Sequence, residues 1–128
     1  MTLACERRLP GTSRPAIEDP HIASRIAMHR AEAAALRALV YDTAFRPTDS
    51  PMAGPEAALN LLLFSELLQR VRETSMQVLG PEGLLLDGDS ERWTQPFLMD
   101  RVWQIAGGTS EIRRNIIAER LLGLPRNY

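Results

Sequence analysis

Two long segments with helical periodicity, each bounded by proline or glycine, constrain the fold of this chain more than any other feature. In the first, Asp19-Pro20 predicts a helix start, because aspartate caps free amide groups and proline fits the first helical position. Apolar residues then recur every three to four positions as far as Arg46-Pro47, where proline moves the preceding residue out of the helical region. The stripe consists of Ile22, Ile26, Ala33, Leu36, Val40 and Ala44, with Arg25, Arg30, Glu32 and Arg37 on other faces.

The second segment predicts a helix from about Pro55 to Leu79, which Gly80-Pro81 stops. It carries apolar residues on two faces, and such a helix is expected to lie centrally, packed on several neighbours. One stripe is Ala57, Leu61, Phe64, Leu68, Val71 and Ser75, and the other is Leu59, Leu63 and Leu67. Residues 46–55, which separate the two helices, are expected to form a loop.

The C-terminal part predicts two shorter helices. Residues 81–91 contain too much glycine and aspartate for a helix, so a third helix is expected from about Thr94 to Ile105, with Pro96 tolerated in its first turn.

A glycine pair, Gly107-Gly108, separates this helix from a fourth, which is expected to run from about Ser110 to Leu122 before the next glycine and proline close it. The chain has no strand-like alternation and no internal repeat. The sequence therefore predicts an all-α fold, an antiparallel four-helix bundle with a long second helix.

The composition fits one soluble domain and excludes several classes of function. A chain of 128 residues with 45% hydrophobic and 24% charged residues is apolar enough to fold, with residues 1–18 expected to be an irregular lead-in and residues 19–128 the domain. A net charge of -1 provides no basic field for nucleic acid or anionic lipid. The N-terminus lacks the apolar run of a secretion signal, and no apolar run is long enough to span a membrane, which predicts a cytoplasmic protein without a membrane partner.

No disulfide, metal site or nucleophilic triad is indicated. Cys5 is the single cysteine, so an internal disulfide is excluded, and this usage fits a reducing compartment. His21 and His29 have no Cys or His at metal-ligand spacing, and His29 is expected to be half-buried beside the apolar stripe. No serine has a visible histidine and acid partner.

The stretch "QIAGGTSEIRRNIIAERLLGLPR", residues 104–126, brings glycines, hydroxyls and charges to a helix start. The first amide groups of a helix lack partners and carry partial positive charge. Gly107 and Gly108 allow a ligand to approach the backbone closely, and Thr109 and Ser110 offer hydroxyls. The pattern suits a phosphate, a pyrophosphate or an enolate oxygen.

The spacing alone favours a structural interpretation of the same residues. Thr109 would cap the helix after a glycine turn, and Glu111 would complement the helix dipole. Arg113 and Arg114 are expected to be solvated or salt-bridged. Trp103 is first of all a packing residue, although its place beside the turn also suits the wall of a pocket.

The same stretch resembles the closing motif of the acyl-CoA dehydrogenase family, flavoproteins that introduce an α,β double bond into acyl-CoA thioesters. Three further stretches are similar to family segments in the same order. "ERRLPG" (6–11) resembles Glu-Arg-x-x-Phe-Gly, "QVLGPEG" (77–83) resembles Gln-x-x-Gly-Gly-x-Gly, and "MDRVWQI" (99–105) resembles Arg-Asp-x-x-x-x-Ile. The likeness covers nearly the whole chain, but only the C-terminal part of a complete family member.

The resemblance implies a fold and a set of partners. In the family, this C-terminal helical domain packs against a helical domain and a β domain, and the helical domains form the core of a dimer or tetramer. FAD and the acyl-CoA thioester lie between the domains. The resemblance therefore implies FAD in the complete enzyme, an acyl-CoA substrate, and a homo-oligomer or a partner subunit.

Roles follow position by position from the resemblance. The residues implied to contact FAD are Arg7, Gln77, Gly80, Pro81, Thr109, Ser110 and Glu111. Arg7 would meet the FAD pyrophosphate of a neighbouring subunit, a task suited to a planar cation with several donors. Gln77 and the backbone of Gly80-Pro81 would meet the adenine side of that same cofactor. Gly108 would face the thioester.

The chain departs from the family pattern at the catalytic base. In many members a glutamate immediately before the Gly-Thr pair removes the α-proton, but that position is Gly107 here, and glycine cannot abstract a proton. Some branches with glycine there carry the base on the first helix of this domain, which is expected to be missing from this chain. Pro10, Pro81 and Met99 replace a Phe, a Gly and an Arg of the family segments.

These departures leave alternative functions open. The first is the C-terminal domain or a short subunit of an FAD-dependent acyl-CoA dehydrogenase, inactive alone, with no catalytic residue of its own. The second is a non-catalytic helical oligomerisation or interaction module derived from that family. The third is a phosphate-binding module that uses only residues 107–111. Self-association is expected, because such a domain normally buries its outer helices against other domains.

Overall fold

The computed structural model describes residues 1–46 and 54–126, and within those ranges the chain consists of helices joined by turns, without a strand. The α-helices are α1 (Thr2–Glu6), α2 (Pro20–Phe45), α3 (Pro55–Leu79), α4 (Gly88–Met99) and α5 (Ser110–Ile116). Shorter turns of 3-10 helix are η1 (Ala16–Glu18), η2 (Gly80–Leu84) and η3 (Asp100–Gln104), and η4 (Ile117–Leu121) is a π-helical turn. The all-α prediction is confirmed; most of the loop expected at 46–55 lies outside the described residues.

The bounds of the two long helices agree with the caps expected from the sequence. The carboxylate of Asp19 accepts hydrogen bonds from the amides of His21 and Ile22, at 2.9 and 3.1 Å, and so satisfies two free donors at the start of α2. Arg46 at its other end has an extended backbone, as expected before proline. Gly80 ends α3 with φ of +59°, a left-handed conformation that favours glycine.

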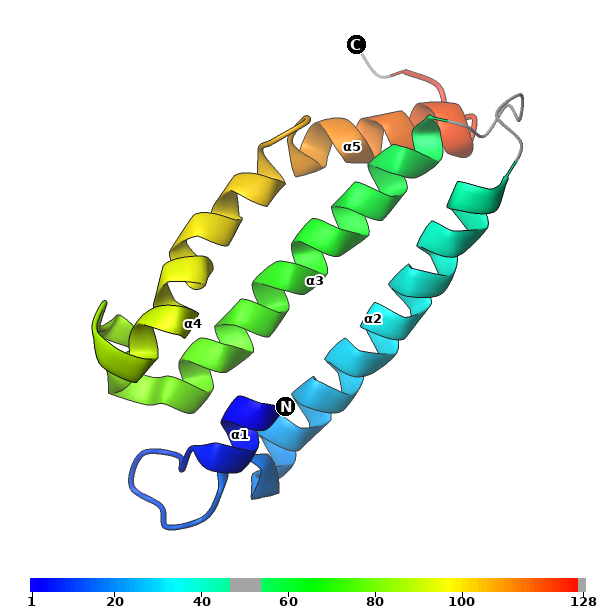
Figure 1. Cartoon of the computed structure of the whole chain (residues 1–128). Helices are drawn as coiled ribbons and strands as arrows, with labels where there is room; N and C mark the ends of the chain where they lie inside the picture. Colours follow the sequence, from blue (N-terminus) through cyan, green and yellow to red (C-terminus); the bar gives the residue numbers. More distant parts are fainter. Residues whose placement is uncertain (47–53, 127–128) are drawn as a thin grey trace.

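Helix α3 is central, as its two apolar faces predict. It contacts α2, α4 and α5, and Figure 1 shows α2 and α4 on opposite sides of α3, with α5 crossing its N-terminal end. The best-buried apolar cluster lies at the other end of α3, where α1 and η1 pack against the start of α2. Its members are Leu3, Ala4, Ala16, Ile22, Val78 and Leu79.

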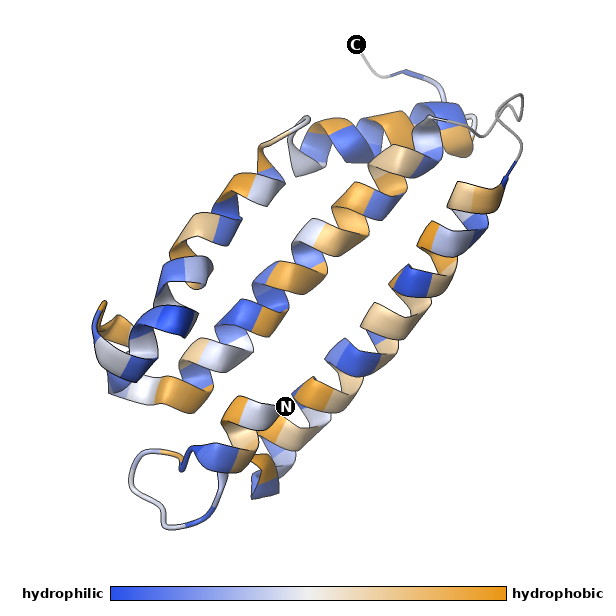
Figure 2. Cartoon of the chain, in the orientation of Figure 1, coloured by the Kyte–Doolittle hydropathy of each residue, from blue (hydrophilic) through white to orange (hydrophobic). Residues whose placement is uncertain are grey.

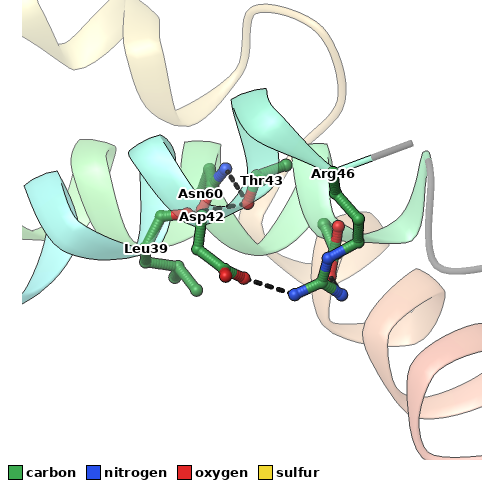
Figure 3. A network of polar contacts seen from close by, with 6 residues as sticks. Leu39, Asp42, Thr43, Arg46 and Asn60 are labelled. Carbon is green, nitrogen blue, oxygen red and sulfur yellow. Dashed lines mark hydrogen bonds and ion pairs between the residues drawn. The ribbon is translucent and has the colours of Figure 1, made fainter. Parts of the chain in front are cut away.

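A polar network joins α2 to α3 near the N-terminal end of α3 (Figure 3). Arg46 forms ion pairs with Asp42 on its own helix and with the buried carboxylate of Glu56 at the start of α3. The amide of Asn60 donates to the hydroxyl of Thr43 at 3.2 Å. These contacts tie the two antiparallel helices together at the end opposite the apolar cluster.

The third helix differs from expectation. Helix α4 begins at Gly88 rather than near Thr94, and η2 occupies part of the segment that was expected to be non-helical. Aspartate and glutamate in the first turn of α4 complement the helix dipole, so the acidic residues indicate a helix start rather than a loop. Pro96 therefore lies inside the helix, where the hydrogen bond that it removes would have gone to the carbonyl of Arg92, an exposed residue.

The apolar stripes of α2 and α3 form an open groove instead of a closed core. Figure 2 shows apolar residues recurring along both helices, yet several stay accessible: Val40 is 44% exposed and Phe64 39%. A groove of about 530 Å³ runs between them. Its lining includes Ala33, Leu36 and Val40 of the first stripe and Phe64, Leu68 and Val71 of the second. The periodicity was predicted correctly, and part of each stripe lines this groove rather than a closed core.

Candidate functional site

The glycine turn between η3 and α5 has a backbone that requires glycine. Gly107 and Gly108 have φ of +70° and +106°, values that side chains with a Cβ rarely adopt. The hydroxyl of Thr109 then accepts a hydrogen bond from the amide of Ile112 at 3.4 Å, so the threonine caps α5 as expected. The fourth helix begins at Ser110, and a π-helical turn continues it to Leu121.

A polar pocket of about 380 Å³ opens at this turn. Its lining comprises Glu66, Gln104, Ile105, Thr109, Ser110, Glu111 and Arg114. Arg114 is exposed and forms an ion pair with Glu66 of α3, in agreement with the expectation that it would be solvated or salt-bridged. Nothing in the sequence pointed to Glu66, because it lies on another helix far along the chain. Trp103 is not part of this lining; it packs edge-on against Phe64, with ring centroids 5.9 Å apart.

Glu111 stays ionised at the mouth of the pocket. A hydrogen bond from its own backbone amide, followed by one from the Thr109 hydroxyl, lowers the pKa of this carboxyl below its ordinary value of 4.5. The carboxylate thus takes up one of the free amides at the helix start. A small anion at this turn would meet that negative charge, which disfavours a general phosphate-binding module.

Arg113 does not lie in solvent, and its expected exposure is wrong. The residue is 1% exposed, and its guanidinium donates to the hydroxyl of Ser65 at 3.2 Å and to the backbone carbonyls of Trp103 and Ala106. Within residues 1–46 and 54–126 it forms no ion pair. Position 113 follows Thr109 by one helical turn, which directs its side chain back over the preceding glycine turn.

The second group of candidate residues lies where α3 ends. Arg7 donates to Glu82 at 2.7 Å, and the side-chain carbonyl of Gln77 accepts from Arg25 at 2.9 Å. Gly80 lies between Gln77 and Glu82 in the sequence, and Pro81 is exposed. A polar pocket of about 300 Å³ includes Arg7 and Glu82 among its lining residues. Only the family resemblance predicted that Arg7 and the end of α3 serve the same site. The hydrogen-bond partners Glu82 and Arg25 were not predicted from the sequence.

The two candidate groups lie at opposite ends of α3. Gly107 lies against Leu61, since a Cβ on the glycine would come within 3.6 Å of the leucine side chain, whereas Gly80 directly follows Leu79. At about 1.5 Å of rise per residue, positions 61 and 79 are about 27 Å apart. Figure 1 shows the glycine turn and the η2 end of α3 well separated. One copy of the chain therefore presents two separate surfaces rather than one enclosed site.

The described residues were also compared with the requirements of a metal site and of a membrane-spanning helix. No three His, Cys, Asp or Glu side chains among them come together as metal ligands would. In the same ranges no helix has both the length and the apolar character needed to cross a bilayer. Cys5 is exposed and free.

The chain is a helical domain of a known class, and it belongs to the acyl-CoA dehydrogenase family. The sequence model of the family's C-terminal domain matches residues 2–122.

Individual relatives agree with this assignment. Acyl-CoA dehydrogenase IpdE1 of Mycolicibacterium smegmatis is 36% identical over 112 residues, which are 87% of this chain and 27% of that protein. IpdE1 of Mycobacterium tuberculosis is 44% identical over 66 residues, 51% of this chain and 17% of that protein. (2S)-methylsuccinyl-CoA dehydrogenase of Cereibacter sphaeroides is 30% identical over 123 residues, 95% of this chain and 21% of that protein. No solved structure matches the chain.

The chain thus spans about a quarter or less of the length of these relatives.

Proposed function

We propose that this chain is the C-terminal domain, or a short subunit, of an FAD-dependent acyl-CoA dehydrogenase, and that it supplies flavin contacts and an oligomer surface. The observation that carries the proposal is the turn at Gly107-Gly108. Both glycines have positive φ, and the turn ends in a threonine-capped helix beside a polar pocket. This local structure occurs in a chain that belongs to the family, in the stretch that resembles its closing motif.

The residues at the turn suit a flavin better than a small anion. The two glycines leave the backbone accessible, and the hydroxyls of Thr109 and Ser110 provide neutral donors and acceptors for a heterocycle. Glu111 keeps its negative charge here, so a neutral ring edge is favoured over a phosphate. Arg7 at the other end of α3 is the cation suited to a pyrophosphate.

The separation of the two groups supports an assembly of more than one chain. Positions about 27 Å apart on one helix would contact different parts of a cofactor, or different cofactors. A second subunit would place its Arg7 and Gln77 beside a flavin held at the first subunit's turn. The proposal therefore includes a homo-oligomer or a partner subunit as a condition for flavin binding.

The chain contributes binding rather than proton transfer. When bound, the flavin of such an enzyme accepts a hydride from the acyl-CoA. Gly107 has no group that removes the α-proton, so the base must come from another segment or subunit. The turn would position ligands, and the isolated chain is expected to be inactive.

The test is reconstitution. The purified chain is titrated with FAD, and flavin fluorescence and acyl-CoA-dependent dye reduction are measured with and without a polypeptide carrying the other two domains. Activity only in the mixture, lost when Thr109→Val and Ser110→Ala are combined, supports the proposal. Activity that is insensitive to both hydroxyls, or flavin binding absent from every mixture, contradicts it.

A second candidate function is supported by the apolar groove between α2 and α3. We propose on this basis that the isolated chain self-associates, with the groove of one copy covering that of another to complete a closed four-helix bundle. Surfaces of this kind are rare on monomeric proteins, because they leave aliphatic and aromatic side chains in water. Under this alternative the chain is a non-catalytic interaction module.

Sedimentation velocity over a range of concentrations tests whether the chain self-associates through the groove. Val40→Glu introduces a charge into the groove, and Leu84→Glu introduces the same charge at a side chain that is 85% exposed and lies outside it. The proposal predicts a dimer that Val40→Glu dissociates and Leu84→Glu retains. A monomer at all concentrations would contradict the proposal that the chain is a self-associating interaction module.

A further inference from the structure

The most deeply buried large side chain in the described part of the chain is a cation, Arg113. It is 1% exposed, and no carboxylate forms an ion pair with it in the described ranges. A buried charge without an opposite charge is costly unless hydrogen bonds replace its hydration. The partners that replace it here are the carbonyls of Trp103 and Ala106 and the hydroxyl of Ser65.

The carbonyl of Trp103 belongs to the last turn of η3, and that of Ala106 to the turn that directly follows η3. The last carbonyls of a helix have no partners within the helix and carry partial negative charge, so they are natural acceptors for a cation. The carbonyl of Trp103 is 3.1 Å from the guanidinium, and the carbonyl of Ala106 immediately precedes Gly107. One side chain therefore binds the backbone on the near side of the glycine turn.

The same residue also belongs to the far side of the turn. Its backbone amide donates to the carbonyl of Thr109 at 3.0 Å, in the first turn of α5. Its side chain reaches Ser65 on α3, which is 0% exposed. Arg113 thus connects both flanks of the Gly107-Gly108 turn to the central helix.

We infer that Arg113 is a positioning residue for the glycine turn: its guanidinium fixes the carbonyls of Trp103 and Ala106, and with them the conformation in which Gly107, Gly108 and Thr109 face a ligand. Two glycines in succession leave the backbone free to adopt many conformations. A planar cation with donors on two terminal nitrogens restricts this freedom, because it binds two carbonyls and a hydroxyl at once.

Lysine and glutamine cannot replace this contact. The ammonium of lysine is a single charged group on a flexible stem, without the planar fork that spans two acceptors. Glutamine is shorter and carries no charge. The use of the turn by a cofactor rests on the proposed function, whereas the restraint on the turn is a property of the chain itself.

The test is native-state hydrogen exchange of the amides of Ala106 and Gly108, which donate to the carbonyls of Val102 and Ile105 at 2.8 and 3.2 Å, measured without flavin. Arg113→Gln is expected to raise exchange at the turn on the order of tenfold, as loss of hydrogen bonds to a charged group predicts. Arg113→Lys should give an intermediate increase. Because no flavin is present, a failure here is distinguishable from a failure of the proposed function.

Two controls separate positioning from general stability. Arg114→Gln removes the adjacent arginine, which pairs with Glu66 at the surface, and should leave exchange at the turn within twofold of the unmodified chain. Val78→Ala weakens the apolar cluster at the other end of α3 and should lower the melting temperature without selectively raising exchange at the turn. The inference is overturned if Arg114→Gln or Val78→Ala selectively raises exchange at the turn. It is also overturned if exchange at the turn is equal in Arg113→Gln and the unmodified chain. If Arg113→Gln does not fold, Arg113→Lys is measured alone. Faster exchange at the turn in Arg113→Lys supports the inference, and unchanged exchange overturns it.

Discussion

The ring of Pro10 lies against Gly80 so closely that a Cβ on the glycine would come within 2.5 Å of the proline Cγ. This contact joins two of the segments that resemble the family, "ERRLPG" and "QVLGPEG". Pro10 stands where the family segment has a Phe, and the contact gives it a structural role. It holds the backbone that follows Arg7 against the C-terminal end of α3.

Gly80→Ala is therefore expected to destabilise the chain more than Gly88→Ala. Both glycines have positive φ, +59° and +53°, so a side chain is strained at either position, and Gly80 also has a ψ of −135°, outside the left-handed helical region. Only Gly80 meets a neighbour, because a Cβ on Gly88 would have nothing within 4 Å. Urea unfolding of the two variants measures the difference.

A double-mutant cycle checks the cause. Pro10→Ala removes the ring atom that overlaps the new Cβ, so Gly80→Ala should cost less in the Pro10→Ala background than in the unmodified chain. Additive effects of Pro10→Ala and Gly80→Ala would refute the contact.

The elements that the sequence predicts well are those with local causes. Asp19 caps α2 through its own side chain, and the left-handed Gly80 ends α3, so each bound follows from a few neighbouring residues. The glycine turn and the cap at Thr109 were predictable for the same reason. The start of helix α4 was misplaced because acidic residues and glycine favour both loops and helix starts, and its packing against α3 and η2 involves residues distant in sequence.

The burial of particular side chains depends on contacts distant in sequence. Arg113 and Arg114 are adjacent and chemically identical, yet one is buried against Ser65 and the other pairs with Glu66 at the surface. Periodicity places them on neighbouring faces, but it does not say which face meets α3. Likewise, the stripe at Val40 predicts an apolar face without saying whether this chain itself covers it.

Glu82→Gln is expected to strengthen binding of FAD in a reconstituted complex. In the free chain Glu82 forms an ion pair with Arg7 at 2.7 Å, so a pyrophosphate would have to compete for the guanidinium. An exposed pair of this kind is worth about 0.2–1 kcal/mol, which corresponds to a gain in affinity of up to about fivefold. Fluorescence titration with FAD measures it.

Glu6→Gln is the matched control, since Glu6 lines the same pocket but forms no ion pair with Arg7 among the described contacts. Equal gains in Glu6→Gln and Glu82→Gln would indicate a general effect of charge. Weaker binding of FAD to Glu82→Gln would contradict the proposal that Arg7 binds the pyrophosphate.

His29 is expected to make stability depend on pH. Burial lowers the pKa of its imidazole below the ordinary value of 6.5; Glu32 opposes this shift, while Arg25 and Arg70 add to it. Its Nε2 lies 2.9 Å from the Thr74 hydroxyl. Because the unfolded chain binds the proton more readily, this contribution is complete above pH 6.5 and is lost as the pH falls through the folded-state pKa.

The measurement is the free energy of unfolding between pH 5 and 8. His29→Gln should flatten the part of the profile just below pH 6.5, whereas His21→Gln should not, since His21 is exposed at the start of α2. An unchanged slope in His29→Gln would show that another group causes the dependence.

Gly107→Glu is expected to destabilise the chain without creating a catalytic base. The substitution restores the glutamate that many family members carry, and Leu61 leaves room for a Cβ at 3.6 Å. The backbone does not, because φ at Gly107 is +70°, where a side chain costs about 1–2 kcal/mol. Gly107→Asn should cost less, since asparagine tolerates this conformation. Two results would mean that the turn adapts to a carboxylate. One is an equal free energy of unfolding for Gly107→Glu and the unmodified chain. The other is acyl-CoA-dependent dye reduction that the reconstituted complex gains with Gly107→Glu.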